Sequence, residues 1–131
     1  MFKDIKMSIS VPCSIGELYD KYSILCIKLE KISDEIKREK VKREMEKILP
    51  IMEKFDLRTD EPLFMRLKAV NDSLWNIEDR IRIKEKEFCF DDEFIFLARK
   101  VYLTNDERYR LKNMINQEFE SELSEVKSYC L

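Results

Sequence analysis

Apolar residues recur at alternating spacings of four and three along most of this 131-residue chain. Such series occupy positions 18–32, 41–55 and 63–81, and shorter ones lie within 97–119. Residues three or four apart lie on the same side of an α-helix, so each series predicts a helix with one apolar face. The repeated pattern predicts an all-α fold: an antiparallel bundle of four to five helices in a single domain over residues 1–131.

Residues that cap helix ends set the predicted boundaries. Ser14 and Glu17 have the spacing of a capping box, and Ser33 is a second N-cap followed by acidic residues. Pro62 follows a loop and suits the first turn of the next helix. Pro50 predicts a kink or a split in the second helix, because proline has no amide hydrogen to donate. The expected helices lie at about 14–32, 34–57, 62–87, 92–103 and 105–127.

The last of these regions has two interpretations. Thr104 and Glu107 repeat the capping-box spacing, which favours a division into two helices. Without that division, one helix of about 35 residues would be about 50 Å long. Such a length favours an extended or oligomeric assembly, so both interpretations stay open at this point.

The N-terminal residues follow a different period. Within 5–11, apolar residues alternate with Lys6, Ser8 and Ser10, and Pro12 ends the pattern. An alternation of this kind predicts a short β-strand over 5–11. Since a strand needs a partner and the rest of the chain offers little strand pattern, pairing across a dimer is the expected solution.

Composition excludes several classes of protein. The chain contains no His, which removes His-ligated zinc and every mechanism that uses an imidazole. Its single Gly excludes the glycine-rich loops that bind phosphates. The 25 basic and 27 acidic residues are interleaved, so no binding to nucleic acid is expected.

The same reasoning gives an expected location. No apolar run approaches the roughly 18 residues of a membrane-spanning helix, and the N-terminal residues lack the apolar core of a signal peptide. The four cysteines form no C-x-x-C pair and are expected to be reduced. We therefore expect a cytoplasmic protein that does not bind membranes.

Polar side chains lie beside the apolar faces of three predicted helices, where a purely structural helix would not need them. On the third helix, Asn71, Trp75, Glu78 and Arg82 follow spacings of four, three and four and share one side. Packing of the helices would bring cations and acids into one cleft, which predicts binding of an anionic small molecule. The candidate ligand-binding residues are Lys21, Lys28, Glu78, Arg82, Arg99, Asn105 and Arg108.

An enzyme hypothesis uses the acids of the same helices. Small all-helical nucleotide pyrophosphohydrolases hold Mg²⁺ with E-x-x-E and E-x-x-D pairs, and Glu17 and Asp20 have the second spacing. Glu78 and Asp79 supply further carboxylates, the ligands that Mg²⁺ prefers. The candidate metal ligands are therefore Glu17, Asp20, Glu78 and Asp79. Outside this hypothesis no cofactor is expected.

Each candidate also has a purely structural interpretation. Glu17 can serve the capping box, and Asn105 can cap the last helix. Glu78 and Arg82 form an i,i+4 pair of a kind common on helix surfaces. Trp75 can be an anchor in the core or at an interface.

Four segments together resemble a known family: SVPCSIGELYDKYSILCIKLEKI at 10–32, LWNIEDRIR at 74–82, FIFLARKVYLTNDER at 94–108, and LSEVKSY near the end. The chain is similar to small uncharacterised proteins grouped as a domain of unknown function. Some bacterial members are labelled lipopolysaccharide biosynthesis proteins, and relatives occur in large viruses. The resemblance implies a one-domain protein with a link to glycan or nucleotide-sugar pathways.

The leading expectation is a small helical accessory or ligand-binding protein, linked through this resemblance to surface-glycan synthesis. It is expected to form a homodimer and to lack enzymatic activity, since no catalytic constellation is present. The alternatives are a Mg²⁺-dependent enzyme acting on a nucleotide or nucleotide-sugar phosphate, and an oligomerising helical scaffold.

Overall fold

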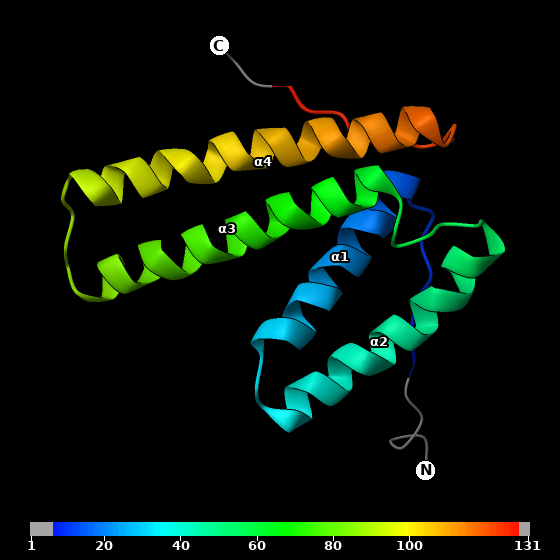
Figure 1. Ribbon diagram of the computed structural model, residues 1–131, viewed down its shortest axis with the longest axis horizontal. Coiled ribbons are helices and arrows are strands. Elements are labelled where there is room, and N and C mark those ends of the chain that lie inside the picture. The colour runs from blue at the N-terminus through cyan, green and yellow to red at the C-terminus, as the bar shows by residue number, and fades with distance from the viewer. Residues whose placement is uncertain (1–6, 129–131) are drawn as a thin grey trace.

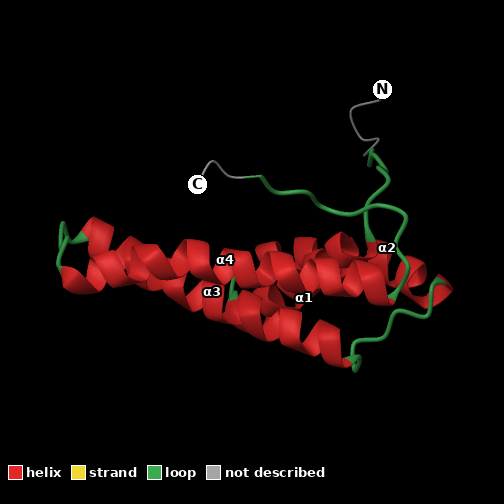
Figure 2. Ribbon diagram, turned by 90° about the horizontal axis from the view of Figure 1, so that it is seen from above, coloured by secondary structure: helices red, strands yellow, loops and turns green. Residues whose placement is uncertain are grey.

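The computed structural model describes residues 7–128 and contains four helices within them (Figure 1). The bounds are Ile15–Lys31 for α1, Glu35–Lys54 for α2, Pro62–Lys86 for α3 and Asp92–Glu118 for α4. The prediction of an all-α fold is therefore confirmed. Figure 2 shows helices joined by short loops, with no strand in the part of the chain that is described.

The predicted N-terminal strand is wrong over residues 7–11, and residues 5 and 6 lie outside the described range. Met7, Ile9 and Val11 have the predicted alternation, yet all three side chains are largely exposed. A strand is stabilised by hydrogen bonds to a neighbouring strand, and residues 7–128 supply none. Alternation without a partner leaves this segment irregular.

The helices are arranged as two hairpins, α1 with α2 and α3 with α4, which diverge from a shared end (Figure 1). α1 is the central element, because it packs against each of the other three helices. The hairpin of α3 and α4 extends well past the end of α1, so its distal part has no third helix beside it (Figures 1 and 2). The molecule therefore has a three-helix region and a two-helix region along the same hairpin.

The hydrophobic core lies where α1 meets the other helices. Tyr19 is completely buried, with its ring 5.0 Å from that of Phe64 and 5.8 Å from that of Phe119. Leu67 and Ile115 are also completely buried. The apolar spacing predicted Leu18 and not Tyr19 as part of the buried face. Because helices pack on two sides of α1, its buried surface is wider than a single stripe.

Two predicted interruptions are absent. α2 continues through Pro50 from Glu35 to Lys54, so it is not split there. α4 is one helix from Asp92 to Glu118, which decides against a boundary at 103–105 and places the end well before the predicted 127. With 27 residues α4 is about 40 Å long. Glu120, at φ 53°, takes the left-handed conformation that ends the helix.

Among residues 7–128, none of the helices combines the length and the apolar character needed to cross a membrane.

Candidate ligand-binding cleft

A buried carboxylate joins α1, α3 and α4. Asp20 on α1 is only 1% exposed; its Oδ1 accepts hydrogen bonds from both α3 and α4, and its Oδ2 accepts one from α4. Asn71 of α3 donates from Nδ2 to Oδ1 at 2.9 Å. Arg108 of α4 donates from Nε to Oδ1 at 2.9 Å and from Nη2 to Oδ2. This bidentate arrangement is the strongest form of an arginine–carboxylate pair. It compensates for the cost of burying the negative charge of Asp20.

Ser23, one turn after Asp20, completes the network. Its hydroxyl donates to the Asp20 carbonyl oxygen at 2.7 Å and accepts from Asn71 Nδ2 at 2.8 Å. The single amide nitrogen of Asn71 therefore contacts both side chains of α1. Since every one of these groups is directional, the network fixes the rotation of α1 relative to α3 and α4.

Arg108 is held in place by this network but is not enclosed by it. The hydrogen bonds to Asp20 raise the pKa of the guanidinium, although partial burial acts in the opposite direction. Its side chain is 27% exposed, and Nη1 makes only a 3.5 Å contact with Asn105 Oδ1. One edge of a permanently charged and oriented guanidinium is therefore left for further contacts.

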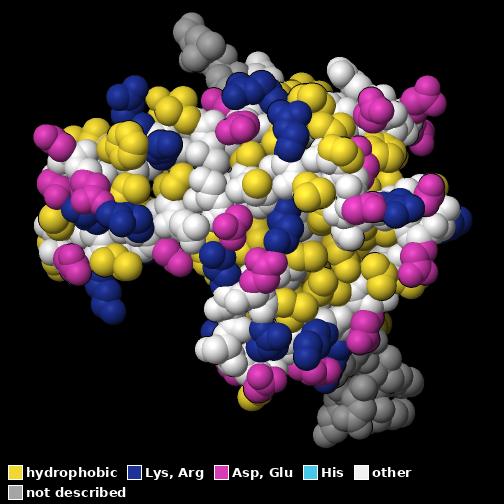
Figure 3. Space-filling view, in the orientation of Figure 1, with side chains coloured by type: hydrophobic (Ala, Val, Ile, Leu, Met, Phe, Trp, Pro, Cys, Tyr) yellow, Lys and Arg dark blue, Asp and Glu magenta, His cyan; other side chains and the backbone are white. Residues whose placement is uncertain are grey.

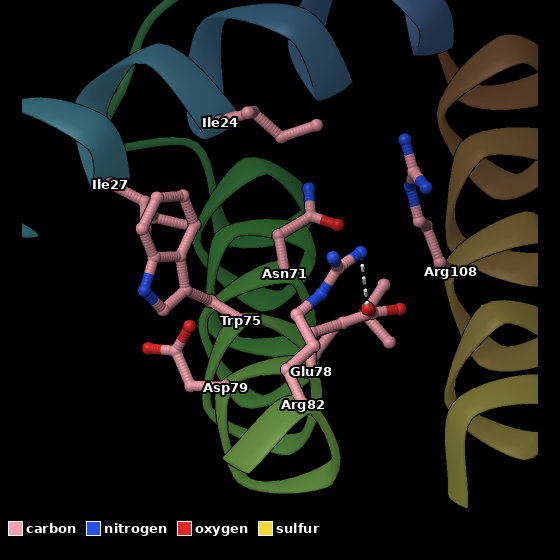
Figure 4. Close-up of a pocket in the computed structure, with 9 residues that line it drawn as sticks. Ile24, Ile27, Asn71, Trp75, Glu78, Asp79, Arg82 and Arg108 are labelled. Carbon is pink, nitrogen blue, oxygen red and sulfur yellow. Dashed lines mark hydrogen bonds and ion pairs between the residues drawn. The ribbon is translucent and has the colours of Figure 1, made fainter. Parts of the chain in front are cut away.

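Arg108 also lines a cleft of about 320 Å³ formed by all three helices (Figure 4). The volume is at the lower end of the range of about 300–1,000 Å³ that is usual for small-molecule sites. The cleft lies where α1 ends and the two-helix part of the hairpin begins. It is lined by Ile24, Ile27, Asn71, Leu74, Trp75, Glu78, Asp79, Arg82 and Arg108.

The cleft has an apolar side and a charged side. Trp75 lies beside Ile27, and Ile24 projects from α1 above Asn71 (Figure 4). On α3, Arg82 Nη2 is 3.4 Å from Glu78 Oε2, and the Arg82 side chain is 78% exposed. An exposed i,i+4 pair of this length contributes at most a few tenths of a kcal/mol. Arg82 is thus free to leave Glu78 for another anion at little cost.

The predicted ligand-binding residues divide into two groups. Glu78, Arg82 and Arg108 line the cleft, with Asn105 beside Arg108. The remaining three lie elsewhere. Lys21 forms an ion pair with Glu44 of α2 at 2.7 Å, and neither Lys28 nor Arg99 lines the cleft. The structure therefore brings three of the seven residues into the cleft, and Asn105 lies outside it.

The predicted metal ligands do not converge. Glu17 Oε2 lies 2.8 Å from Lys112 Nζ, and Asp20 is bound to Arg108 and Asn71. Only Glu78 and Asp79 line the cleft. Among residues 7–128, no three or more acidic or cysteine side chains are grouped so as to hold a metal ion. Glu17 and Asp20 are paired with cations of α4, which the spacing on α1 did not reveal.

The only glycine controls how closely α1 approaches α4. The Gly16 amide donates to Asn116 Oδ1 at 2.7 Å. A Cβ at this position would lie 2.5 Å from the Lys112 carbonyl oxygen and 2.9 Å from Asn116 Oδ1. Close contact at Gly16 brings Asp20, one turn later, opposite Arg108. The glycine is thus a packing residue that positions the site.

Several residues that form the site or support it were not among the predicted site residues. Asn71 and Trp75 lie in the same helical row as Glu78 and Arg82, so that row was the signal for them. Lys112 is buried between Glu17 and Glu125, with Nζ 2.8 Å from a carboxylate oxygen of each. Ser23 gave no signal, because a single serine on a helix is common.

Comparison with known proteins places the chain in a family. Residues 7–131 match the model described as a family of unknown function, DUF6165. The chain belongs to this family. No curated protein and no solved structure matches this DUF6165 chain. The expected membership of a domain of unknown function is therefore confirmed, while the family description carries no activity, ligand or pathway.

Proposed function

We propose that this protein binds a compact organic anion in the cleft between α1, α3 and α4. The observation that carries the proposal is Arg108, which is oriented by the buried Asp20 and lines a cleft that also contains Arg82 and Trp75. A fixed cation at the border of an apolar cleft selects a ligand that has both a charged and an apolar part.

The charged part of the ligand is a carboxylate or a phosphate. Asp20 balances the charge of Arg108 but uses only Nε and Nη2, so the Nη1 edge remains for a ligand oxygen. Arg82 supplies the second cation by giving up its 3.4 Å contact with Glu78. Two guanidinium groups on different helices can then bind one anion, and Glu78 disfavours ligands with negative charge on its side of the cleft.

The apolar part of the ligand packs against Trp75, Ile24 and Ile27. An indole favours planar rings, and the cleft volume favours one ring over an extended nucleotide sugar. Nucleoside monophosphates, sugar phosphates and aromatic carboxylates therefore make up the first group of ligands to test. Sugar phosphates also address the link to glycan synthesis that the family resemblance implies.

Trp75 is the only tryptophan in the chain, so its fluorescence reports on the cleft without labelling. We expect a saturable change in Trp75 emission with at least one of these ligands, and a melting temperature that rises with ligand concentration. A ligand at 100 times its Kd stabilises the folded state by about 2.7 kcal/mol.

The variant Arg82→Gln gives the sharpest comparison, because this side chain is exposed and its loss does not disturb the core. We expect affinity to fall about tenfold or more, consistent with the loss of one charge-assisted contact. Arg66→Gln, on the exposed surface of the same helix, is the matched control and should bind like the unchanged protein. Equal affinity in all three proteins, or no saturable signal with any ligand, would contradict the proposal.

A further inference from the structure

The side of α4 that faces away from the other helices is unusually apolar. Ile95, Phe96, Tyr102 and Leu103 are 56%, 58%, 53% and 48% exposed, although α4 already buries Leu97 on its opposite side. Figure 3 shows apolar side chains over this part of α4 at the upper left, with Lys and Arg side chains between them. Exposed apolar surface bordered by polar residues often marks an interaction site.

Two charged residues border the centre of this surface. Arg99, Tyr102, Leu103 and Asp106 follow the spacing i, i+3, i+4, i+7, so they lie on one side of α4. Neither Arg99 nor Asp106 has an ion-pair or hydrogen-bond partner among residues 7–128, so both side chains are available for contacts with another molecule. The arrangement is a cation and an anion placed symmetrically about two exposed apolar side chains.

We propose that this surface binds a second copy of the chain, with the two α4 helices antiparallel and the two-fold axis between Tyr102 and Leu103. Antiparallel pairing about that axis places Tyr102 opposite the partner's Leu103. It also places Arg99 opposite the partner's Asp106, and the symmetry repeats each contact. In the same register Phe96 lies opposite the partner's Tyr109 and extends the apolar contact toward both ends, where Ile95 meets the partner's Arg110.

The charges select this register over its neighbours. An axis at Arg99 would place Arg99 against the partner's Arg99, and Asp92 against the partner's Asp106, which are like-charge contacts. A shift that pairs Arg99 with the partner's Asp92 would overlap α4 by only about two turns. The proposed register overlaps residues 92–113, about 33 Å of helix.

This interface does not depend on the proposed ligand. Arg99 and Arg108 are nine residues apart, which is half a turn out of phase, so they point to opposite sides of α4. The cleft at Arg108 therefore stays open in the dimer, and failure of either proposal leaves the other standing.

Sedimentation equilibrium of the full chain over a range of concentrations tests the interface. We expect a reversible dimer for the unchanged protein. Arg99→Asp and Asp106→Arg should each raise the dissociation constant at least tenfold, because two ion pairs become two repulsions. The double variant Arg99→Asp/Asp106→Arg should restore the original value to within about threefold, since the two charges have only been exchanged.

Control variants separate this surface from others. Met65→Glu introduces a charge at an exposed apolar position of α3 and should leave the dissociation constant unchanged, whereas Leu103→Glu should give a monomer with unaltered circular dichroism. A monomer at all concentrations for the unchanged protein would overturn the proposal. So would a dimer whose stability responds to Asp92→Arg and not to Asp106→Arg, since that result would require the shorter register.

Discussion

The hairpin of α3 and α4 has two halves that differ in how far their charged side chains are buried. In the proximal half, beside α1, Asp20, Asn71 and Arg108 form a network around a completely enclosed carboxylate. In the distal half, beyond α1, Lys84 binds Asp91 at 2.8 Å and Glu93 at 3.2 Å near the surface. Both halves pair carboxylates with cations, but the proximal carboxylate comes from α1, whereas the distal carboxylates lie at the start of α4.

The difference between them is the presence of a third helix. α1 removes water from the proximal charges, so a missing partner there leaves an uncompensated charge in a poorly solvated site. The distal carboxylates of Asp91 and Glu93 are 48% and 42% exposed, so water and ions reach them and replace a missing Lys84 at little cost. Stability should therefore be sensitive to the first set of charges and tolerant of changes in the second.

The largest effect is expected for Asp20→Asn. The change keeps the shape of the side chain but leaves the Arg108 guanidinium partly buried without its counter-charge, and we expect a loss of about 3 kcal/mol in the free energy of unfolding. Urea denaturation measures it. A loss below about 1 kcal/mol would mean that water reaches this network as it does the distal one.

Gly16→Ala tests whether close packing of α1 positions the network. In an open helix this substitution stabilises by about 1 kcal/mol. Here the new Cβ would lie 2.5 Å from a backbone oxygen of α4, so we expect a net loss of about 1–3 kcal/mol. Ser73→Ala, at an exposed position of α3, is the control and should not destabilise. A gain in stability for Gly16→Ala would show that α1 can move away without penalty.

The smallest effect is expected for Lys84→Gln in the distal half. The substitution removes the contacts to Asp91 and Glu93, which are solvated, so the urea midpoint should change far less than in Asp20→Asn. The remaining difference from the unchanged protein should disappear in 1 M salt, where the screening length is only about 3 Å. A salt-independent loss would place Lys84 among the buried charges.

The pH dependence of the same variant gives a second measurement. The hydrogen bond from Lys84, helped by the Phe94 amide, lowers the pKa of Asp91 from 3.8 to about 2. A depressed carboxyl pKa stabilises the folded state above pH 3.8, and that contribution is lost as the pH falls toward 2. The stability difference between the unchanged protein and Lys84→Gln should therefore narrow over this range. Carbon NMR of Asp91 should give a higher pKa in the variant.

Much of the fold was predictable because it depends on local spacing. The apolar series at 18–32 and 63–81 predicted helices close to α1 and α3, and Ser14 caps α1 by accepting from the Glu17 amide at 3.0 Å. The prediction of a strand was wrong over 7–11, because a strand depends on a partner strand as well as on alternation, and residues 7–128 supply no such partner. The predicted boundary at 103–105 is absent, because Thr104 and Asp106 lie inside one continuous helix, α4.

The site was predictable only where it lies on one helix. Glu78 and Arg82 share a helical row with Asn71 and Trp75, and all four line the cleft. The buried network joins Asp20 to Asn71 and Arg108, which are 51 and 88 positions away in the sequence, and helical spacing carries no information over such separations. For the same reason the spacing of Glu17 and Asp20 predicted a metal-binding pair, although each side chain forms an ion pair with a cation of α4.

The sequence by itself determined the helices, the absence of imidazole and glycine-loop chemistry, and the polar row on α3. Each of these follows from residue type or from spacing within about two turns. The tertiary structure decided which charges are buried and which carboxylates are neutralised. It also placed Gly16 at the closest approach of α1 to α4. The reason is physical: the free energy of a charged side chain depends on the water and partners around it, and distant segments of the chain supply both.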